Sequence, residues 1–368
     1  MLKTRVNTSK FSKQKVALGL SGGVDSTAAA LILTQEGYEV IGVFLDVLGD
    51  NEDGKKSAMS LAEKLEIELI CVDVSEDFSE IVIADFCNEY MKGRTPNPCI
   101  LCNPTVKFKY LQKIADEVGA YYMATGHYAN IVYDEAENCH FISKAKNIKK
   151  DQSYMLYRLN AGVLSRLKFP LGNFDSKEDV RSFVEEKGLK NARQKDSQEI
   201  CFIPDEIHYI DYLLSRGYKI TEGQFINSAG EKLGTHKGVQ NYTIGQRKNL
   251  GITFGKPMFV VNLDGKTNQV TLGEHDELMK TEVKSVNNNF IDGKSEATAS
   301  SLIPDNYIGK TVQAKVRYAA TPANATLKQI NDDTICAVFE IPQRAIAPGQ
   351  SIVFYDGDKV IGGGIING

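Results

Sequence analysis

From Val16 the sequence alternates short apolar runs with segments of helix length. The runs VALGL, YEVIGVFLD and IELICVDV are separated by TAAALILTQEG and SAMSLAEKL, with few residues between them. This alternation predicts parallel strands joined by crossover helices, which is the doubly wound α/β class. A sheet of this class binds ligands at the carboxyl ends of its strands. We therefore look for a functional site where the strands are predicted to end.

The stretch LGLSGGVDS, Leu18 to Ser26, stands at the first of these strand ends. Its two adjacent glycines allow a sharp turn that brings backbone N–H groups close to an anion, and the helix that follows favours negative charge at its N-terminus. The pattern predicts a phosphate site. A Walker loop would need a lysine where Val24 and Asp25 stand, which disfavours a P-loop NTPase. A ligand-free turn of small residues is the structural alternative, and the two serines and the acid weigh against it.

A second strand end points to the same edge of the sheet. The helix-like segment KYLQKIADEVG leads into YYMATGHYA, which reads as a strand that ends in small and polar residues. The carboxyl ends of parallel strands share one edge, so Gly126 and His127 are expected beside the glycine loop.

The segment GRTPNPCILCNPTVKF, residues 93–108, places Cys99 and Cys102 in C-x-x-C spacing after two prolines, which favour an extended and rigid path. This spacing suits half of a zinc site, a redox pair or part of an iron–sulfur site. No second C-x-x-C or paired histidine follows, which disfavours zinc alone. Cys201, in RQKDSQEICFIP, is by itself expected to be a buried structural thiol.

The other cysteines give weaker signals. Cys71, in LICVD, is expected to be a buried strand residue, and the remaining three are expected to be structural or surface residues: Cys87, Cys139 and Cys336. Seven cysteines in a long chain without a secretory signal do not indicate a disulfide scaffold.

After about Cys201 the sequence changes to short strands separated by Gly, Asn and Asp turns, as in MFVVNLDGKTNQVTLG and SIVFYDGDKVIGGG. Period-two alternation between such turns predicts antiparallel β structure, a barrel or a sandwich. We interpret NNNFIDGKSEATASSLIPDN as a polar connection within it. The chain of 368 residues is therefore divided into an α/β domain at 1–205, a small middle domain at 206–275 and a C-terminal antiparallel barrel at 276–368.

The net charge of -4 provides no global basic field, so a nucleic-acid partner would need local patches. Residues 1–15 carry five basic residues and no acid, and a second cluster comprises Lys144, Lys146, Lys149 and Lys150. Taken alone, each cluster is more typical of a solvated face or tail than of a binding patch. No run reaches the ~18 apolar residues of a membrane span, and no secretory signal is evident, so we expect a soluble, cytoplasmic protein with no membrane partner.

Seven segments in this order allow a family assignment: SGGVDS, GRTPNPCILCN, ATGHYA, KDQSYML, DSQEICFIP, YTIGQRKNLGI and PGQSIVFYDGDKVIGGGII. Together they resemble the bacterial tRNA-specific 2-thiouridylases, the MnmA family within the PP-loop ATP-pyrophosphatases. The resemblance extends from Lys15 to Gly368. SGGVDS alone would indicate only the wider ATP-pyrophosphatase class, whereas the two cysteine segments and YTIGQRK are more specific.

The resemblance implies an enzyme that uses ATP with Mg²⁺ to adenylate the C2 oxygen of the wobble uridine of tRNA. A protein persulfide, charged by a cysteine desulfurase or a sulfur-relay protein, then supplies sulfur as AMP leaves. Asp25 would be a partner for Mg²⁺ beside the pyrophosphate. The implied ATP-binding residues are Gly19, Leu20, Ser21, Gly22, Gly23, Val24, Asp25, Ser26, Leu45 and Gly126.

By the same resemblance Cys201 would carry the persulfide, and Cys102 would be the nucleophile that frees the sulfur and leaves a Cys102–Cys201 disulfide. Both roles need thiolate character, so at least one thiol should lie in a polar or electropositive, accessible pocket. One loop is expected to move when tRNA binds, so that the two thiols can meet. Asn97, Pro98 and Cys99 would contact the target base, and the implied tRNA contacts are His127, Lys150, Asp151, Gln152, Arg317, Tyr318 and Gln350.

Position 99 departs from the family pattern, because cysteine stands where aspartate is usual. Cys99, Cys102 and Cys201 could together hold a [4Fe-4S] cluster with one open iron, in which case no protein persulfide would be required.

Two other functions are weighed against tRNA thiolation. An amide-forming ligase of the ATP-pyrophosphatase class would leave the paired cysteine segments and the β domain unexplained. A non-catalytic RNA-binding protein with an inert nucleotide fold would not exchange labelled pyrophosphate into ATP.

Overall fold

The computed structural model describes residues 12–189, 200–252, 255–291 and 300–367. Its first sheet is parallel, with strand order β3-β2-β1-β4-β7. The strands are β1 (Ser12–Gly19), β2 (Glu39–Asp46), β3 (Glu68–Asp73), β4 (Ala120–Ala124) and β7 (Leu167–Lys168). The doubly wound α/β class predicted from the alternation is thereby confirmed. β1 lies between β2 and β4, so the chain reverses its direction of winding at the end of β1, which is where such sheets bind ligands.

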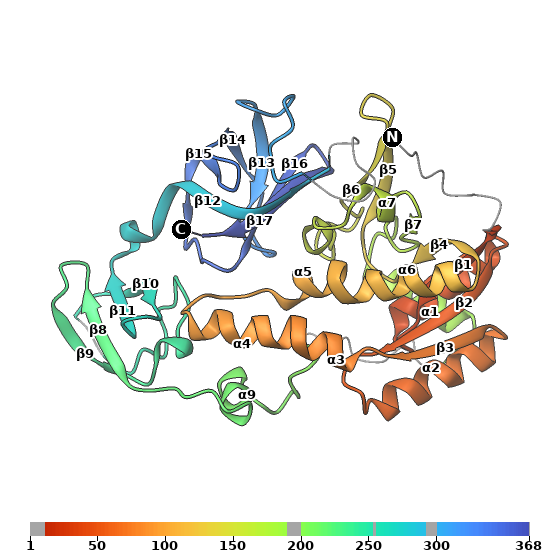
Figure 1. The fold of residues 1–368 in the computed structure, drawn as a ribbon, viewed down its shortest axis with the longest axis horizontal. Coiled ribbons are helices and arrows are strands. Elements are labelled where there is room, and N and C mark those ends of the chain that lie inside the picture. The colour runs from red at the N-terminus through yellow and green to blue at the C-terminus, as the bar shows by residue number, and fades with distance from the viewer. Residues whose placement is uncertain (1–11, 190–199, 253–254, 292–299, 368) are drawn as a thin grey trace.

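Helices cover both faces of this sheet (Figure 1). On one face α1 (Val24–Gln35) and α2 (Glu52–Leu65) bury their apolar side chains against β1 and β2. On the other face α6 (Phe108–Glu117) packs through Leu111 and Ile114 against β1, β2 and β4. α8 (Lys177–Glu186) packs on α1 through Val180 and Val184, which places its first turn near the end of β1.

A run of short helices connects β3 to α6. It comprises α3 (Ser75–Asp77), the π-helical segment η2 (Phe78–Ile83), α4 (Ala84–Met91), α5 (Pro98–Cys102) and a second π-helical segment, η3 (Asn103–Lys107). Pro98 occupies the first turn of α5, where a proline costs no intrahelical hydrogen bond. The extended path expected from the prolines therefore ends at Asn97, and both Cys99 and Cys102 lie on α5.

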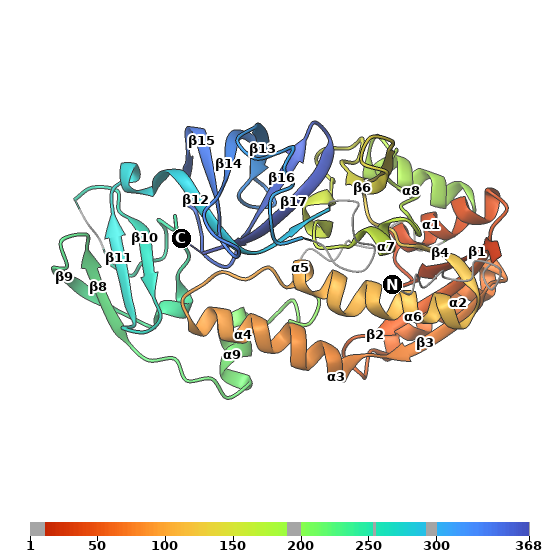
Figure 2. The ribbon, with the colours of Figure 1, turned by 45° about the horizontal axis from the view of Figure 1, so that its top comes forward.

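The middle part of the chain forms a four-stranded sheet in the order β10-β11-β8-β9. It follows α9 (Tyr209–Ser215) and consists of β8 (Gly223–Asn227), β9 (Lys232–His236), the short helix η6 (Val239–Asn241), β10 (Phe259–Asp264) and β11 (Gln269–Gly273). Its own core contains Phe225, Val260 and Leu272. In Figure 2 it lies at the end of the molecule farthest from β3.

The C-terminal strands close into a six-stranded antiparallel barrel, because β12 pairs with both β15 and β17. After η7 (His275–Leu278) these strands are β12 (Met279–Phe290), β13 (Thr311–Lys315), β14 (Ala323–Gln329), β15 (Ile335–Arg344), β16 (Ser351–Asp356) and β17 (Lys359–Ile366). The alternation of the sequence allowed a barrel or a sandwich, and the pairing of β12 with both β15 and β17 shows that it is a barrel. The expected polar connection was partly wrong, since its first residues, 287–290, continue β12; residues 292–299 lie outside the described ranges.

The barrel is joined to the α/β part by a hairpin that sequence analysis did not foresee. β5 (Asn130–Asp134) and β6 (Cys139–Ser143) pair with each other, and Ser143 pairs with Lys359 of β17. Lys359 also forms an ion pair of 2.7 Å with Asp134. The short elements η4 (Ser153–Leu156) and α7 (Ala161–Leu164) pack beside this hairpin.

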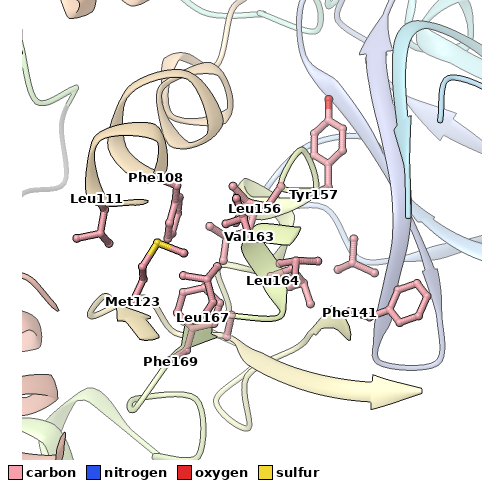
Figure 3. Packing of buried hydrophobic residues seen from close by; sticks show 14 of the residues in the cluster. Phe108, Leu111, Met123, Phe141, Leu156, Tyr157, Val163, Leu164, Leu167 and Phe169 are labelled. Carbon is pink, nitrogen blue, oxygen red and sulfur yellow. The ribbon is translucent and has the colours of Figure 1, made fainter. Parts of the chain in front are cut away.

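Figure 3 shows the core that unites these parts. Phe108 and Leu111 of α6, Met123 of β4, Phe141 of β6 and Leu164 of α7 belong to one buried cluster. The barrel, the hairpin and the sheet therefore share a continuous core, which fixes the barrel relative to the strand ends.

The exposure of four cysteines can be compared with the sequence expectations for them. Cys71 was expected to be buried but is exposed, because β3 is the edge strand of its sheet. Cys87, Cys139 and Cys336 are buried, as expected of structural thiols. Within the described ranges, no helix combines the length and the apolar character needed to cross a membrane.

Candidate active site

The glycine loop connects β1 to α1. Gly23 is the N-cap residue of α1, with φ -75° and ψ 165°, and no side chain in the described structure caps the helix. The hydroxyl of Ser26 donates to the Gly23 carbonyl at 3.0 Å and lies 3.3 Å from the Ser21 hydroxyl. Exposed N–H groups at a helix N-terminus, together with two hydroxyls, form a site that suits a phosphate group.

The backbone conformation and the close packing at position 22 require a glycine. Its φ is +79°, and a Cβ at this position would lie 2.6 Å from the Ser57 hydroxyl oxygen and 3.0 Å from the Ala58 backbone nitrogen of α2. Gly23 has no such constraint, since its nearest neighbour would be the Ser21 hydroxyl at 3.5 Å. The two adjacent glycines therefore have different roles.

The change Gly22→Ala is expected to lower the free energy of unfolding by about 1–3 kcal/mol, because it combines a left-handed φ with a steric clash. Gly23→Ala is the matched control and should leave stability nearly unchanged. Thermal unfolding of both variants measures the difference. Equal melting temperatures for the two variants would contradict the role given to Gly22.

Gly126, after β4, contacts the first turn of α1. A Cβ at Gly126 would lie 2.8 Å from the backbone carbonyl carbon of Asp25. The structure thus places the two strand ends predicted from sequence in direct contact. Close backbone approach of this kind is possible only for glycine.

A cavity of about 290 Å³ lies between these strand ends. Apolar side chains of Val43, Phe44 and Leu45 line one side of it, and Thr125, Gly126 and His127 line another. The glycine loop contributes Gly19, Leu20, Ser21, Asp25 and Ser26, and the remaining lining residues are Val47, Cys102, Val106, Lys107 and Gln152. An apolar slot next to a phosphate-type loop fits a purine ring and its ribose.

His127 lies in this smaller cavity, although the family resemblance assigns it to tRNA. Its ring stacks on Phe108 at 5.9 Å, and its Nδ1 is 2.7 Å from the Thr125 hydroxyl. Part of the ring remains accessible, yet the surrounding aromatic rings remove enough solvent to hold the pKa of His127 well below its usual value; the nearby Lys107 adds to this effect. The ring is therefore neutral at neutral pH.

Lys177 was missed by sequence reasoning. Its ammonium group lies 2.7 Å and 2.6 Å from the two carboxylate oxygens of Asp25, and the Tyr128 hydroxyl donates to the same carboxylate at 2.7 Å. The Lys177 side chain is only 12% exposed. A nearly buried cation at the N-terminus of α1 suits the pyrophosphate of a nucleotide. No local motif signals it, because Lys177 and Asp25 are 152 residues apart in the chain.

Asp25 was expected to be a partner for Mg²⁺. Mg²⁺ bound to nucleotide phosphates needs only one or two protein carboxylates, and Asp25 stands at the loop that would hold those phosphates. The residues present are compatible with this role, with Lys177 sharing the carboxylate.

A second, larger cavity of about 940 Å³ extends from the glycine loop to the cysteines. It shares Ser21, Asp25 and Ser26 with the smaller cavity. Pro98, Cys99, Cys102 and Cys201 line its far side, and four lysines contribute to its wall: Lys107, Lys149, Lys150 and Lys177. One continuous space therefore joins the phosphate loop, the thiols and a set of cations.

The three thiols of the larger cavity differ in exposure, and burial raises the pKa of two of them, Cys102 and Cys201. Cys99 and Cys201 are exposed and Cys102 is half-buried. The cavity walls reduce the solvation of Cys201 and raise the pKa of its thiol to about 11, and Cys99 and Cys102 act in the same direction while Lys107 opposes them. Burial likewise raises the pKa of Cys102. The expected electropositive, accessible pocket is present, yet both thiols are protonated at neutral pH in this state.

The three cysteines do not form a metal site as they stand. Across the parts of the chain that the structure describes, no group of three His, Cys, Asp or Glu side chains is arranged to hold a metal ion. All three are free thiols. The donor set therefore does not fit an iron–sulfur cluster in this conformation.

The remaining residues assigned to tRNA occupy different places. Lys150, Gln152 and Tyr318 line the larger cavity. Asp151 is buried, and its carboxylate accepts hydrogen bonds from the Ala145 and Ser153 backbones and the Ser153 hydroxyl, so it holds the loop rather than facing the cavity.

Asn97, Arg317 and Gln350 are not among the residues that line the larger cavity. The Gln350 amide donates to the carbonyls of Thr95 and Pro96 at 2.9 and 3.4 Å, which ties the barrel to the segment before α5. Arg317 is exposed and donates to the Arg344 carbonyl. The Asn97 amide lies 3.5 Å from the Met155 sulfur.

Comparison with known proteins gives three consecutive family-model matches. Residues 14–205 match the tRNA methyl transferase HUP domain, 211–274 the tRNA methyl transferase PRC-barrel domain, and 299–366 the aminomethyltransferase beta-barrel domain. In chain order, the three matches cover the parallel sheet with its helices, the four-stranded middle sheet and most of the C-terminal barrel.

Among curated relatives, the tRNA-specific 2-thiouridylase MnmA 1 of Caldanaerobacter subterraneus is 45% identical, over 96% of this chain and 97% of its own length. The tRNA-specific 2-thiouridylase MnmA of Clostridioides difficile is 43% identical, over 97% of this chain and 99% of its own.

Solved structures give weaker similarity. The U34-tRNA thiolase NcsA from Methanococcus maripaludis, described with its [4Fe-4S] cluster, is 23% identical with a TM-score of 0.34, over 54% of this chain and 65% of that chain. The NMN synthetase from Francisella tularensis has a TM-score of 0.33 at 16% identity, over 57% and 79% of the two chains. Both TM-scores are low, and the fold assignment rests on the family models and the sheet topology.

Proposed function

Because the chain belongs to the tRNA-specific 2-thiouridylase family, we propose that it is an ATP-dependent sulfurtransferase that thiolates C2 of the wobble uridine of tRNA. One observation carries the proposal: the larger cavity joins the glycine loop to Cys102 and Cys201. Activation by ATP and delivery of sulfur could therefore take place on one bound uridine without release of the activated base.

In the first step the C2 oxygen of the uridine attacks the α-phosphorus of ATP, the ring nitrogen N3 loses its proton, and pyrophosphate leaves. The adenosine would lie in the smaller cavity, and the phosphates at the N-terminus of α1 beside Lys177 and Asp25. Backbone N–H groups and a cation at this point stabilise the charge on the departing pyrophosphate. Mg²⁺ held by Asp25 would neutralise further phosphate charge.

In the second step the terminal sulfur of a Cys201 persulfide attacks C2, and AMP leaves. Cys102 then attacks the Cys201 sulfur. The Cys102–Cys201 disulfide forms, the bond between the Cys201 sulfur and the transferred sulfur breaks, and 2-thiouridine leaves. The proton that Cys102 loses returns to N3 of the product. A thiol reductant and a persulfide donor protein, such as a cysteine desulfurase or a sulfur-relay protein, would restore the enzyme.

The tRNA would approach over the larger cavity. Lys149, exposed, and Lys150, half-buried, line its wall and would contact phosphates, which position the anticodon stem without reading sequence. The wobble uridine would be turned out of its stack into the cavity, where Pro98 and Cys99 lie. Tyr318 lines the same cavity from the barrel. Asn97 and Arg317 each precede a lining residue in the chain, Pro98 and Tyr318.

The test is thiolation of tRNA by the full chain purified without oxygen. Iron, sulfide and visible absorption are measured first, and the protein is then incubated with tRNA, ATP and Mg²⁺, with and without a persulfide donor. Digested tRNA is analysed by mass spectrometry for 2-thiouridine. We expect the product to form with cluster-free protein, only when ATP and the persulfide donor are present.

Two results would overturn this proposal in different ways. Product that forms only when iron and sulfide are bound would favour the cluster mechanism through Cys99, Cys102 and Cys201. No 2-thiouridine under any condition, with no tRNA-dependent exchange of pyrophosphate into ATP, would favour a non-catalytic RNA-binding protein.

A further inference from the structure

We propose that Lys107 stabilises negative charge on the sulfur atoms of Cys102 and Cys201 during sulfur transfer, an assignment that rests on the function proposed above. Lys107 lines the smaller cavity together with the glycine loop, and it lines the larger cavity together with both cysteines. It therefore lies at the junction between the predicted nucleotide position and the thiols.

The local fold explains why Lys107 reaches this position. It is the last residue of η3, a π-helical segment that directly follows Cys102. Pro104 lies inside this segment and has no N–H to donate to the carbonyl four residues earlier, which favours a wider turn. Hydrogen bonds in a π-helix link residues five apart, and Cys102 and Lys107 have this separation. The Lys107 backbone N–H donates a hydrogen bond to the Cys102 sulfur, which favours the thiolate.

The electrostatic environment supports the assignment. Burial raises the pKa of Cys102 and of Cys201, and the Lys107 ammonium group opposes this effect at both thiols. Lys177, another lysine of the cavity wall, is already paired with Asp25. Lys107, by contrast, forms no ion pair with any carboxylate that the structure describes. Its charge remains available to an anionic sulfur.

The reaction needs such a cation. Sulfur transfer uses an anionic persulfide on Cys201 and then a thiolate on Cys102, while the resting thiols are protonated at neutral pH. A fixed positive charge in a partly desolvated cavity stabilises each anion without reorganisation. Lys107 would thereby make both sulfur atoms reactive.

The test measures alkylation of each cysteine by iodoacetamide as a function of pH, resolved by peptide mass spectrometry, in the full chain without tRNA or ATP. In the wild-type protein the rate at Cys201 should rise with pH up to about 11, where its thiol ionises. In Lys107→Met we expect both profiles to move to higher pH, and alkylation at pH 8 to slow by about three- to tenfold. Lys107→Arg keeps the charge and should restore most of the rate.

Lys113→Met is the matched control, because Lys113 is an exposed residue of the adjoining helix α6 and packs over the Tyr110 ring. Circular dichroism and thermal unfolding establish that each variant is folded. Unchanged alkylation profiles in folded Lys107→Met would overturn the proposal, as would an equal effect of Lys113→Met. If the wild-type chain makes no 2-thiouridine, the proposed function fails, whereas the alkylation result is read independently of that outcome.

Discussion

Replacing Cys201 with serine is expected to reduce formation of 2-thiouridine by at least about a thousandfold, because the change removes the proposed carrier of the persulfide. The adenylation step should survive. Cys201 lines only the larger cavity, whereas the smaller cavity holds the predicted nucleotide position. The variant should therefore retain tRNA binding and tRNA-dependent exchange of labelled pyrophosphate into ATP, within about threefold of wild type.

Cys71→Ser is the matched control for this experiment, since Cys71 is also an exposed thiol but lies on the edge strand β3. It should thiolate tRNA normally. Single-turnover assays with a persulfide donor measure the sulfur step, and pyrophosphate exchange measures the first step. Undiminished product from Cys201→Ser would remove Cys201 from the mechanism. Loss of both activities together would mean that Cys201 supports the nucleotide site and not the sulfur step alone.

The second large effect is expected at Lys177. Lys177→Met should slow tRNA-dependent pyrophosphate exchange by about a hundredfold, because it removes a nearly buried cation from the predicted pyrophosphate position. It also leaves the Asp25 carboxylate with only the Tyr128 hydroxyl among the partners that the structure gives it. Leaving a partly buried charge unpaired lowers stability as well, so the melting temperature should fall.

Two further variants distinguish the loss of the cation from the effect of leaving Asp25 unpaired. Lys187→Met changes an exposed lysine at the other end of α8 and should alter neither exchange nor stability. The double change Asp25→Asn and Lys177→Met removes the unpaired charge and should recover much of the lost stability while exchange remains slow. Exchange in Lys177→Met within threefold of wild type would show that the lysine only neutralises Asp25.

Local patterns were enough to predict the sheet and the glycine loop. Strand and helix periodicity, and the turn that two glycines permit, depend on residues a few positions apart. Val24 to Gln35 and Phe108 to Glu117 form helices close to the expected ranges for this reason. The same reasoning placed Gly126 next to the loop, because parallel strands share one edge.

Local patterns gave wrong predictions where the exposure or the length of a strand depends on which other strands pair with it. LICVD has the composition of a buried strand, yet Cys71 is exposed because β3 is the edge strand of the sheet that the structure describes. In a similar way NNNF reads as a polar turn but extends β12, where pairing with β17 satisfies its backbone groups. Strand pairing over long distances decided both cases.

The sequence by itself indicated the fold class and the glycine loop, because steric and periodic constraints act between neighbours along the chain. The sulfur roles of Cys102 and Cys201 followed only from the resemblance to the 2-thiouridylase family. Only the tertiary structure decided that the hairpin of β5 and β6 joins the barrel, that Lys177 pairs with Asp25, and that Lys107 lines both cavities. The hairpin pairing and the Lys177–Asp25 contact join segments far apart in the chain, so no local spacing encodes them. Lys107 is close to Cys102 in the chain, but only packing brings it to the glycine loop and Cys201.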